Sequence, residues 1–235
     1  MNNTDIIALI DLTRLVENDS LQSIIELCHK ATTPFGPVAA VCVYPEFVAT
    51  AKNTLRDTPI AVATVVNFPS GNESLTITEQ KIKESLAAGA DEIDIVMPYQ
   101  QLQLGDLNYV TKYLLKCREL TRKHCLKIII ESGALSPTQV NEATSIVAKI
   151  GADFVKTSTG KIEHGASFAA VETILQVLAA LDDAPGIKIS GGIRTPQQAH
   201  DYLQLITNYM GASWIAPQTV RLGASKLLDE LLSSH

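Results

Sequence analysis

Short segments rich in β-branched residues recur along this chain, and each is followed by a longer segment with the periodicity of a helix. The eight expected strands are residues 6–11, 38–43, 60–66, 92–96, 127–131, 153–157, 186–189 and 212–215. The expected helices are residues 21–31, 45–55, 76–88, 107–123, 137–149, 168–181, 196–206 and 222–232. This alternation is typical of parallel βαβ units, because two parallel strands need a crossover connection that is usually a helix.

Eight such units close into a barrel or open into a doubly wound sheet. The open sheet is disfavoured because no G-x-G-x-x-G motif follows the first expected strand. The 235 residues contain no Pro/Ser-rich linker, and one barrel commonly has this length. The sequence therefore predicts the α/β class and a (β/α)8 TIM barrel, with residues 1–235 as a single domain. In such barrels the active site lies at the C-terminal ends of the strands.

Helix-capping residues and turn sequences support this division of the chain into strands and helices. Ser136-Pro137 and Thr195-Pro196 resemble an N-cap followed by proline at the first helical position. The near-repeats at residues 88–91 and 150–153 each contain Gly-Ala-Asp and lead from a helix end into a strand. We expect the two segments to form the same turn.

Composition narrows the classes of partner. A net charge of −6 without a long Lys/Arg run argues against nucleic acid and membrane partners, so a small metabolite is expected. The N-terminal residues lack the features of a signal peptide, and no apolar run approaches the roughly 18 residues of a membrane span, so a cytoplasmic location is expected. The four cysteines form no CxxC pair and are expected to be free thiols. A homodimer is one possible assembly.

Ionisable residues interrupt four of the apolar strands. Glu92 and Asp94 share one face of their strand, and Lys127 shares a face with Glu131. Because helices cover the outside of a barrel, these charges should point inward, together with Lys156 and Lys188. One interpretation is a set of balanced ion pairs that fills the barrel, since isolated buried charges are costly. The other is a catalytic site.

Lys156 and Lys188 favour the catalytic interpretation. They lie on successive strands, whose axes are about 5 Å apart in a sheet, so their amines can approach each other. At its ordinary pKa, only on the order of 0.04% of lysine is neutral at pH 7. Burial and repulsion between two ammonium groups both favour the neutral amine, which is the nucleophile. Asp94, from a third strand, is placed to shuttle protons through water.

Glycine-rich loops follow the last expected strands. Gly191-Gly192 and residues 223–225 are candidate phosphate cradles, because barrels often hold phosphate in these loops. The alternative is that they are ordinary turns.

Taken together, these residues resemble the deoxyribose-phosphate aldolase family of class I aldolases. The most specific match is Phe-Val-Lys-Thr-Ser-Thr-Gly-Lys at residues 154–161, which is similar to the Schiff-base motif of that family. Residues 92–99 are similar to its catalytic-aspartate strand, and residues 186–195 to its second-lysine strand. Further similar segments are residues 11–13, 41–45, 67–71, 127–131 and 221–225. The resemblance covers nearly the whole chain in order.

The resemblance implies reversible cleavage of 2-deoxy-D-ribose 5-phosphate to D-glyceraldehyde 3-phosphate and acetaldehyde, in deoxyribose phosphate catabolism, without a cofactor or metal. It implies that Lys156 forms the imine, Lys188 perturbs the pKa of Lys156, and Asp94 joins the proton relay. The residues expected by the same resemblance to bind substrate are Asp11, Cys42, Lys127, Thr159, Gly160, Lys161, Gly191, Gly192 and Ser225. For Cys42 the alternative is core packing, and for Lys127 it is a structural ion pair.

Two departures from the family pattern affect these expectations. Some members end in a tail whose tyrosine assists proton transfer, whereas this sequence ends in Leu-Leu-Ser-Ser-His at residues 231–235, so any tail-dependent step needs another group. Lys226 stands where members often have a second serine. It either strengthens phosphate attraction or lies on an exposed helix face, and we favour exposure.

Two rival functions are compatible with the fold. A metal-dependent aldolase or isomerase is disfavoured because the five histidines show no close metal-ligand spacing. A sugar-phosphate-binding barrel without catalysis would use the lysines as anion receptors only.

Overall fold

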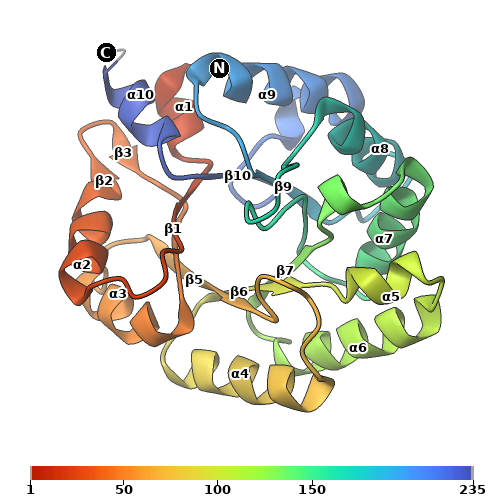
Figure 1. Ribbon diagram of the computed structural model, residues 1–235. Helices are drawn as coiled ribbons and strands as arrows, with labels where there is room; N and C mark the ends of the chain where they lie inside the picture. The colour runs from red at the N-terminus through yellow and green to blue at the C-terminus, as the bar shows by residue number, and fades with distance from the viewer. Residues whose placement is uncertain (1, 234–235) are drawn as a thin grey trace.

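The computed structural model describes residues 2–233 and shows a closed barrel of eight parallel strands (Figure 1). The barrel strands are β1 (Ile10–Arg14), β4 (Ala40–Val43), β5 (Ala61–Val66), β6 (Glu92–Val96), β7 (Cys125–Ile129), β8 (Phe154–Lys156), β9 (Gly186–Ser190) and β10 (Val220–Ala224). Each strand pairs with its neighbour in the chain, and β1 pairs with β10 to close the ring. This confirms the predicted (β/α)8 TIM barrel.

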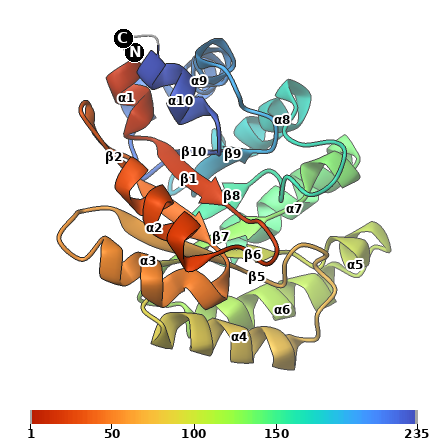
Figure 2. The same cartoon turned by 60° about the vertical axis from the view of Figure 1, so that its left-hand side comes forward.

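Helices surround the barrel, as the turned view shows (Figure 2). They are α1 (Asn3–Ile7), α2 (Leu21–Lys30), α3 (Val48–Thr54), α4 (Leu75–Ala87), α5 (Tyr99–Gln103), α6 (Leu107–Leu120), α7 (Pro137–Lys149), α8 (Phe168–Leu178), α9 (Pro196–Met210) and α10 (Leu227–Ser233). The expected N-caps are confirmed, because Ser136 and Thr195 each form a capping box with a proline in the first turn. Outward strand residues such as Ile93 and Ile95 are fully buried beneath these helices.

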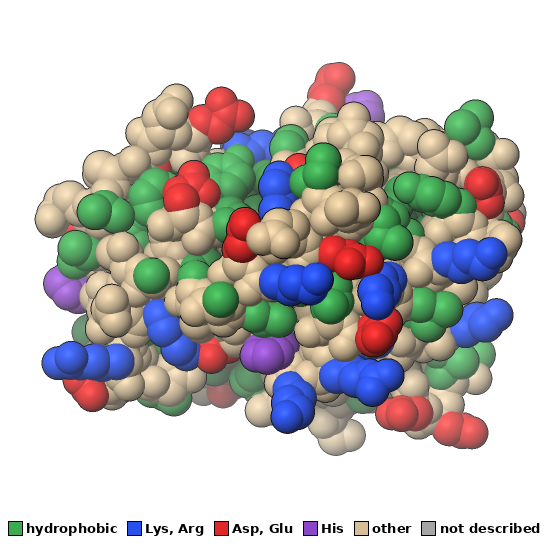
Figure 3. Space-filling model, turned by 90° about the horizontal axis from the view of Figure 1, so that it is seen from below, with side chains coloured by type: hydrophobic (Ala, Val, Ile, Leu, Met, Phe, Trp, Pro, Cys, Tyr) green, Lys and Arg blue, Asp and Glu red, His purple; other side chains and the backbone are tan. Residues whose placement is uncertain are grey.

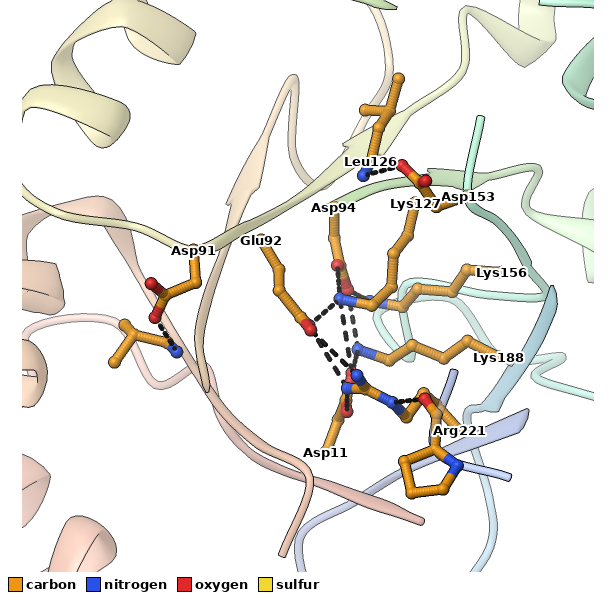
Figure 4. A network of polar contacts seen from close by, with 12 residues as sticks. Asp11, Asp91, Glu92, Asp94, Leu126, Lys127, Asp153, Lys156, Lys188 and Arg221 are labelled. Carbon is orange, nitrogen blue, oxygen red and sulfur yellow. Dashed lines mark hydrogen bonds and ion pairs between the residues drawn. The ribbon is translucent and has the colours of Figure 1, made fainter. Parts of the chain in front are cut away.

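The two Gly-Ala-Asp repeats form matching turns, as expected. Asp91 accepts a hydrogen bond from the backbone N–H of Val62 at 2.8 Å, and Asp153 accepts one from that of Leu126 at 2.7 Å (Figure 4). A basic side chain from a helix also contacts each carboxylate: Lys52 contacts Asp91, and Arg118 contacts Asp153. The repeats therefore fasten helices to the start of neighbouring strands.

The first and the last strand of the barrel differ from the sequence prediction. Residues 6 and 7 belong to α1, which begins at a capping box formed by Asn2, and the first strand starts only at Ile10. The expected strand 212–215 is wrong, because Ala212–Trp214 form a 3-10 turn, η3. The eighth strand is β10, so the predicted helix 222–232 begins only at Leu227. Inward Arg221 and Gly223 interrupt the apolar pattern by which a strand is recognised.

Smaller elements were also missed. A short hairpin, β2 (Thr32–Thr33) with β3 (Gly36–Pro37), follows α2, and α5 precedes α6. The expected helix 45–55 is divided into the 3-10 turn η1 (Pro45–Phe47) and α3.

On the face seen in Figure 3, acidic and basic side chains are interspersed, and no single sign covers it. Among residues 2–233, no helix combines the length and the hydropathy needed to cross a membrane.

Candidate active site

The interior of the barrel is divided into a charged part and an apolar part. Seven ionisable residues from β1, β6, β7, β8, β9 and β10 direct their side chains into it, and each residue is at most 8% exposed (Figure 4). This charged cluster consists of Asp11, Glu92, Asp94, Lys127, Lys156, Lys188 and Arg221. Alternation along the strands directs them inward, and the register places Asp94 beside Lys127 and Lys156 beside Lys188.

Asp94 is the central acceptor of the cluster. Its Oδ2 accepts hydrogen bonds from Lys156 Nζ at 2.7 Å and Lys188 Nζ at 2.8 Å, and its Oδ1 accepts one from Lys127 Nζ at 3.0 Å. Burial alone would raise the pKa of Asp94, but the three cations outweigh it and hold this pKa well below its ordinary value. Asp94 is therefore ionised at neutral pH.

The two lysines that share this oxygen differ in their other partners. Lys188 also pairs with Asp11 at 2.5 Å and has no exposed side-chain surface, whereas the ion pair of Lys156 is with Asp94. Burial opposes the charge of Lys188, but Asp11 and Asp94 outweigh it and raise the pKa of Lys188 above its ordinary value. Burial, with the repulsion of Lys188, lowers the pKa of Lys156 despite Asp94. Lys156 is thus the lysine that loses its proton more easily.

A second group of contacts, made by Arg221 and Lys127, stabilises the charged cluster. Arg221 donates to Asp11 at 2.6 Å and to Glu92 at 2.9 Å, and Lys127 donates a short hydrogen bond to Glu92. The Arg221 guanidinium also lies 5.5 Å from the ring of Phe154. Lys127 is therefore held by carboxylates and has no exposed side-chain surface. These contacts fit the structural ion pair that is the alternative to substrate binding for Lys127.

A cavity of about 690 Å³ opens beside Lys156 at the C-terminal ends of the strands. Of the residues expected to bind substrate, those that line it are Thr159, Gly160, Lys161, Gly191, Gly192 and Ser225. Asp11, Cys42 and Lys127 are fully buried and are not among the lining residues, nor are Asp94 and Lys188. Lys156 is the member of the charged cluster that lines the cavity.

The apolar part of the interior lies on β4 and β5. Ala40, Cys42, Ala63 and Val65 form a buried group against which Tyr44 and other apolar side chains pack. Burial raises the pKa of Cys42, so its thiol is neutral. Alternation along β4 and β5 places these small side chains on the inner face of the barrel.

Glu131 is a site residue whose role the sequence did not indicate. It follows β7 with a left-handed backbone at φ 53°, and its buried carboxylate accepts hydrogen bonds from the Thr159 N–H at 3.1 Å and the Thr159 hydroxyl. The Thr159 hydroxyl in turn accepts one from the Lys161 N–H at 3.0 Å. Burial raises the pKa of Glu131. Glu131 therefore fixes the loop that directly follows Lys156.

Further functional residues were missed because they come from separate parts of the chain. One of them is Arg221 on β10, although an arginine inside an apolar strand is a usable sequence signal. Additional residues that line the cavity are Arg14, Lys30, Ser190, Arg194 and Lys226. Lys226 is exposed, as favoured from the sequence, but it also borders the cavity. Within residues 2–233, no group of three or more His, Cys, Asp or Glu side chains could hold a metal ion.

Comparisons with known proteins agree with this geometry. Residues 5–228 match the model of the DeoC/LacD family aldolases. A crystal structure of a candidate deoxyribose-phosphate aldolase from Coccidioides immitis is 29% identical, with a TM-score of 0.84 over 98% of this chain and 87% of that chain. The aldolase QR15 is 26% identical, with a TM-score of 0.84 over 98% and 97%. The tetrameric deoxyribose phosphate aldolase from Aeropyrum pernix shares the fold at 22% identity, with a TM-score of 0.82 over 100% and 94%.

Proposed function

The chain belongs to the DeoC/LacD family of aldolases, and we propose that it reversibly cleaves 2-deoxy-D-ribose 5-phosphate to D-glyceraldehyde 3-phosphate and acetaldehyde through a Schiff base on Lys156. The observation that carries this proposal is the pair of lysines on one carboxylate oxygen, with pKa values displaced in opposite directions. Lys188 remains a cation, while Lys156 supplies the neutral amine next to the cavity.

In the proposed reaction, the Lys156 amine attacks the aldehyde carbon of the open-chain sugar. The carbinolamine loses water and becomes an iminium. When the hydroxyl on the third carbon loses its proton, the bond between the second and third carbons breaks, and its electron pair moves into the iminium to give an enamine. D-glyceraldehyde 3-phosphate leaves first. Protonation of the enamine carbon and hydrolysis then release acetaldehyde and restore Lys156. The iminium nitrogen is the electron sink, so the chemistry needs no metal or organic cofactor.

Asp94 and the cavity loops support the other requirements of this reaction. Asp94 lies 2.7 Å from Lys156 Nζ, so it can hold a proton that moves to or from the carbinolamine, directly or through a water molecule. The loops after β8, β9 and β10 line the cavity and would take the phosphate.

The test is reductive trapping. The protein is incubated with 2-deoxyribose 5-phosphate and borohydride, and the modified residue is located by mass spectrometry. We expect a stable adduct on Lys156 and none on Lys161, which lines the same cavity. Lys156→Leu should fold and lose activity. The absence of an adduct, under conditions that trap a known imine-forming aldolase, would reject the mechanism and favour a binding barrel. Loss of activity on chelation would favour the metal-dependent rival.

A further inference from the structure

Strand β8, which ends in Lys156, is the shortest strand of the barrel. It has 3 residues, whereas the other barrel strands have between 4 and 6. A short strand makes few ladder hydrogen bonds with its neighbours, so the contacts directly beyond its end contribute more to its position. Thr157, the residue after Lys156, makes these contacts.

Thr157 extends the pairing of β8 with β9 through its side chain. Its N–H donates to the Lys188 carbonyl oxygen at 3.0 Å, as in a regular parallel ladder. Its own carbonyl oxygen is turned toward β7, where it accepts from the Ser132 N–H at 2.8 Å. The Thr157 hydroxyl takes over on the β9 side, because it accepts from the Ser190 N–H at 3.0 Å and donates to the Ser190 carbonyl oxygen at 3.0 Å. A side chain thus forms the last link between the strands that carry Lys156 and Lys188.

Ser190 supplies a second link from the β9 side. Its hydroxyl donates to the Ser158 carbonyl oxygen at 2.6 Å. Its side chain packs closely on β10, because a Cβ added to Gly223 would lie 2.8 Å from the Ser190 Cβ. Thr157 and Ser158 are fully buried and Ser190 is nearly so. A buried polar group that loses its partner is costly, so these hydrogen bonds hold the ends of β8 and β9 together.

The position of the end of β8 bears directly on the reacting amine. Lys156 Nζ and Lys188 Nζ share one oxygen of Asp94, at 2.7 and 2.8 Å. A displacement of about 1 Å between groups that must be aligned can cost on the order of a hundredfold in rate. Thr157 is not among the residues that line the cavity, so its influence on the reaction passes through Lys156 and β9.

We propose that Thr157 is a positioning residue, whose hydroxyl holds the end of β8 against β9 and so fixes the Lys156 amine beside Asp94. This inference rests on the proposed function for the role of Lys156 as the nucleophile. Ser190 supports the same contact, but it also lines the cavity, so a change there alters the surface that the substrate meets. Thr157 is therefore the better position for a test.

The first experiment is Thr157→Val, which keeps the branched shape of the side chain but can neither donate nor accept a hydrogen bond. We expect kcat for 2-deoxyribose 5-phosphate to fall about tenfold, because the amine is no longer held in alignment. KM should stay within about twofold, because the groups that contact the substrate are unchanged. Thr157→Ser keeps the hydroxyl and should recover most of kcat.

The matched control is Thr64→Val. Thr64 is also fully buried on a barrel strand, and its hydroxyl donates to the Val43 carbonyl oxygen on the neighbouring strand at 2.8 Å. This contact joins β5 to β4, and neither strand carries an active-site lysine. The kcat of Thr64→Val should stay within about twofold of the wild type, while thermal unfolding reports the stability that each variant loses.

Equal losses of kcat in Thr157→Val and Thr64→Val would overturn the inference, because they would show a general effect of a lost buried hydroxyl. A normal kcat in folded Thr157→Val would overturn it as well. If Thr157→Val does not fold, Thr157→Cys takes its place, because a thiol is only a weak donor and acceptor. Its kcat should then lie below that of Thr157→Ser, and an equal kcat would reject the role of the hydroxyl.

A second experiment separates this inference from the proposed function. Pentane-2,4-dione condenses with a neutral amine to an enaminone, which is followed by ultraviolet absorbance and located by mass spectrometry, without turnover of a sugar. Thr157→Val should slow this reaction at Lys156 about fivefold, as proton transfer with Asp94 becomes less well aligned, and leave the exposed Lys123 unaffected. If Thr157→Val slows it but the wild type does not cleave the sugar phosphate, the proposed function fails and the positioning role stands. If cleavage is normal and Thr157→Val reacts at the rate of the wild type, the positioning role is rejected.

Discussion

Lys188→Met tests the origin of the nucleophilic amine. In the wild type, the Lys188 cation lies against the same Asp94 oxygen as Lys156, and its repulsion helps burial to lower the pKa of Lys156. Without Lys188, the ammonium form of Lys156 loses a repulsive neighbour and keeps Asp94 as its partner. The loss of this repulsion raises the pKa of Lys156, so the neutral amine forms only at a higher pH.

The size of the effect follows from the geometry. The two Nζ atoms lie 2.7 and 2.8 Å from one oxygen, so they are at most about 5.5 Å apart. At an effective dielectric constant of about 20, two unit charges at that separation repel by about 3 kcal/mol. This energy corresponds to on the order of a hundredfold in the ratio of neutral to charged Lys156. We therefore expect an activity loss of that order at neutral pH.

The assay is kcat/KM for 2-deoxyribose 5-phosphate across about pH 6 to 10, the range in which a displaced lysine titrates. For Lys188→Met, the acidic limb should move to higher pH, so the loss should shrink as pH rises. Lys188→Arg keeps the cation and should keep the acidic limb in place. Circular dichroism and thermal unfolding check that each variant folds. A loss of the same factor at every pH, or a limb moved to lower pH, would refute the electrostatic argument.

Three further predictions concern the supports of the site. Glu131→Leu leaves the Thr159 donors without their acceptor and should lower kcat/KM about tenfold for phosphorylated and unphosphorylated sugar alike. Glu131→Gln should restore most of this kcat/KM. Unchanged kinetics in Glu131→Leu would reject the positioning role. Arg221→Met leaves two buried carboxylates undercompensated and should lower the free energy of unfolding in urea by about 3 kcal/mol; a change below about 1 kcal/mol would show that the lysines compensate. Because the folded-state pKa of Asp94 is depressed, the stabilisation that its carboxylate gives should be present above about pH 4 and lost as pH falls further. The free energy of unfolding, measured by denaturation at several pH values, should therefore fall with decreasing pH, and it should fall less steeply in Asp94→Asn.

The sequence predicted the bounds of strands and helices well where the signals for them are local. Strand β6 and helix α7 have the predicted bounds, because alternation, a capping box and proline are local signals. Strand β10 was misplaced because what makes it a strand is not local. Its Arg221 is compensated by Asp11 and Glu92, which lie far away in the chain, so the segment does not read as a buried strand.

The candidate site shows the same division between local and distant information. Side chains alternate between the two faces of a strand, so the sequence predicts that Asp94 and Lys156 point into the barrel. The closed barrel then brings them together, as expected. Which of the inward charged side chains reaches the cavity could not be predicted, because exposure depends on depth along the barrel axis. For the same reason, only the folded structure shows that Lys127 lies among carboxylates, or that Lys226 is both exposed and beside the cavity.

The composition of the charged cluster explains why one particular amine becomes neutral. It contains three carboxylates, Asp11, Glu92 and Asp94, and four basic groups, so it carries one excess positive charge when all are ionised. A buried cluster with an excess charge is stabilised when one cation gives up its proton. Arg221 does not deprotonate at ordinary pH, and Lys127 and Lys188 each contact more than one carboxylate. Lys156 remains, with one carboxylate partner and access to the cavity. The charge balance of the whole cluster, and not Lys188 alone, thus selects the nucleophile. Removing Asp11 would leave Lys188 with Asp94 as its carboxylate partner and should weaken that selection.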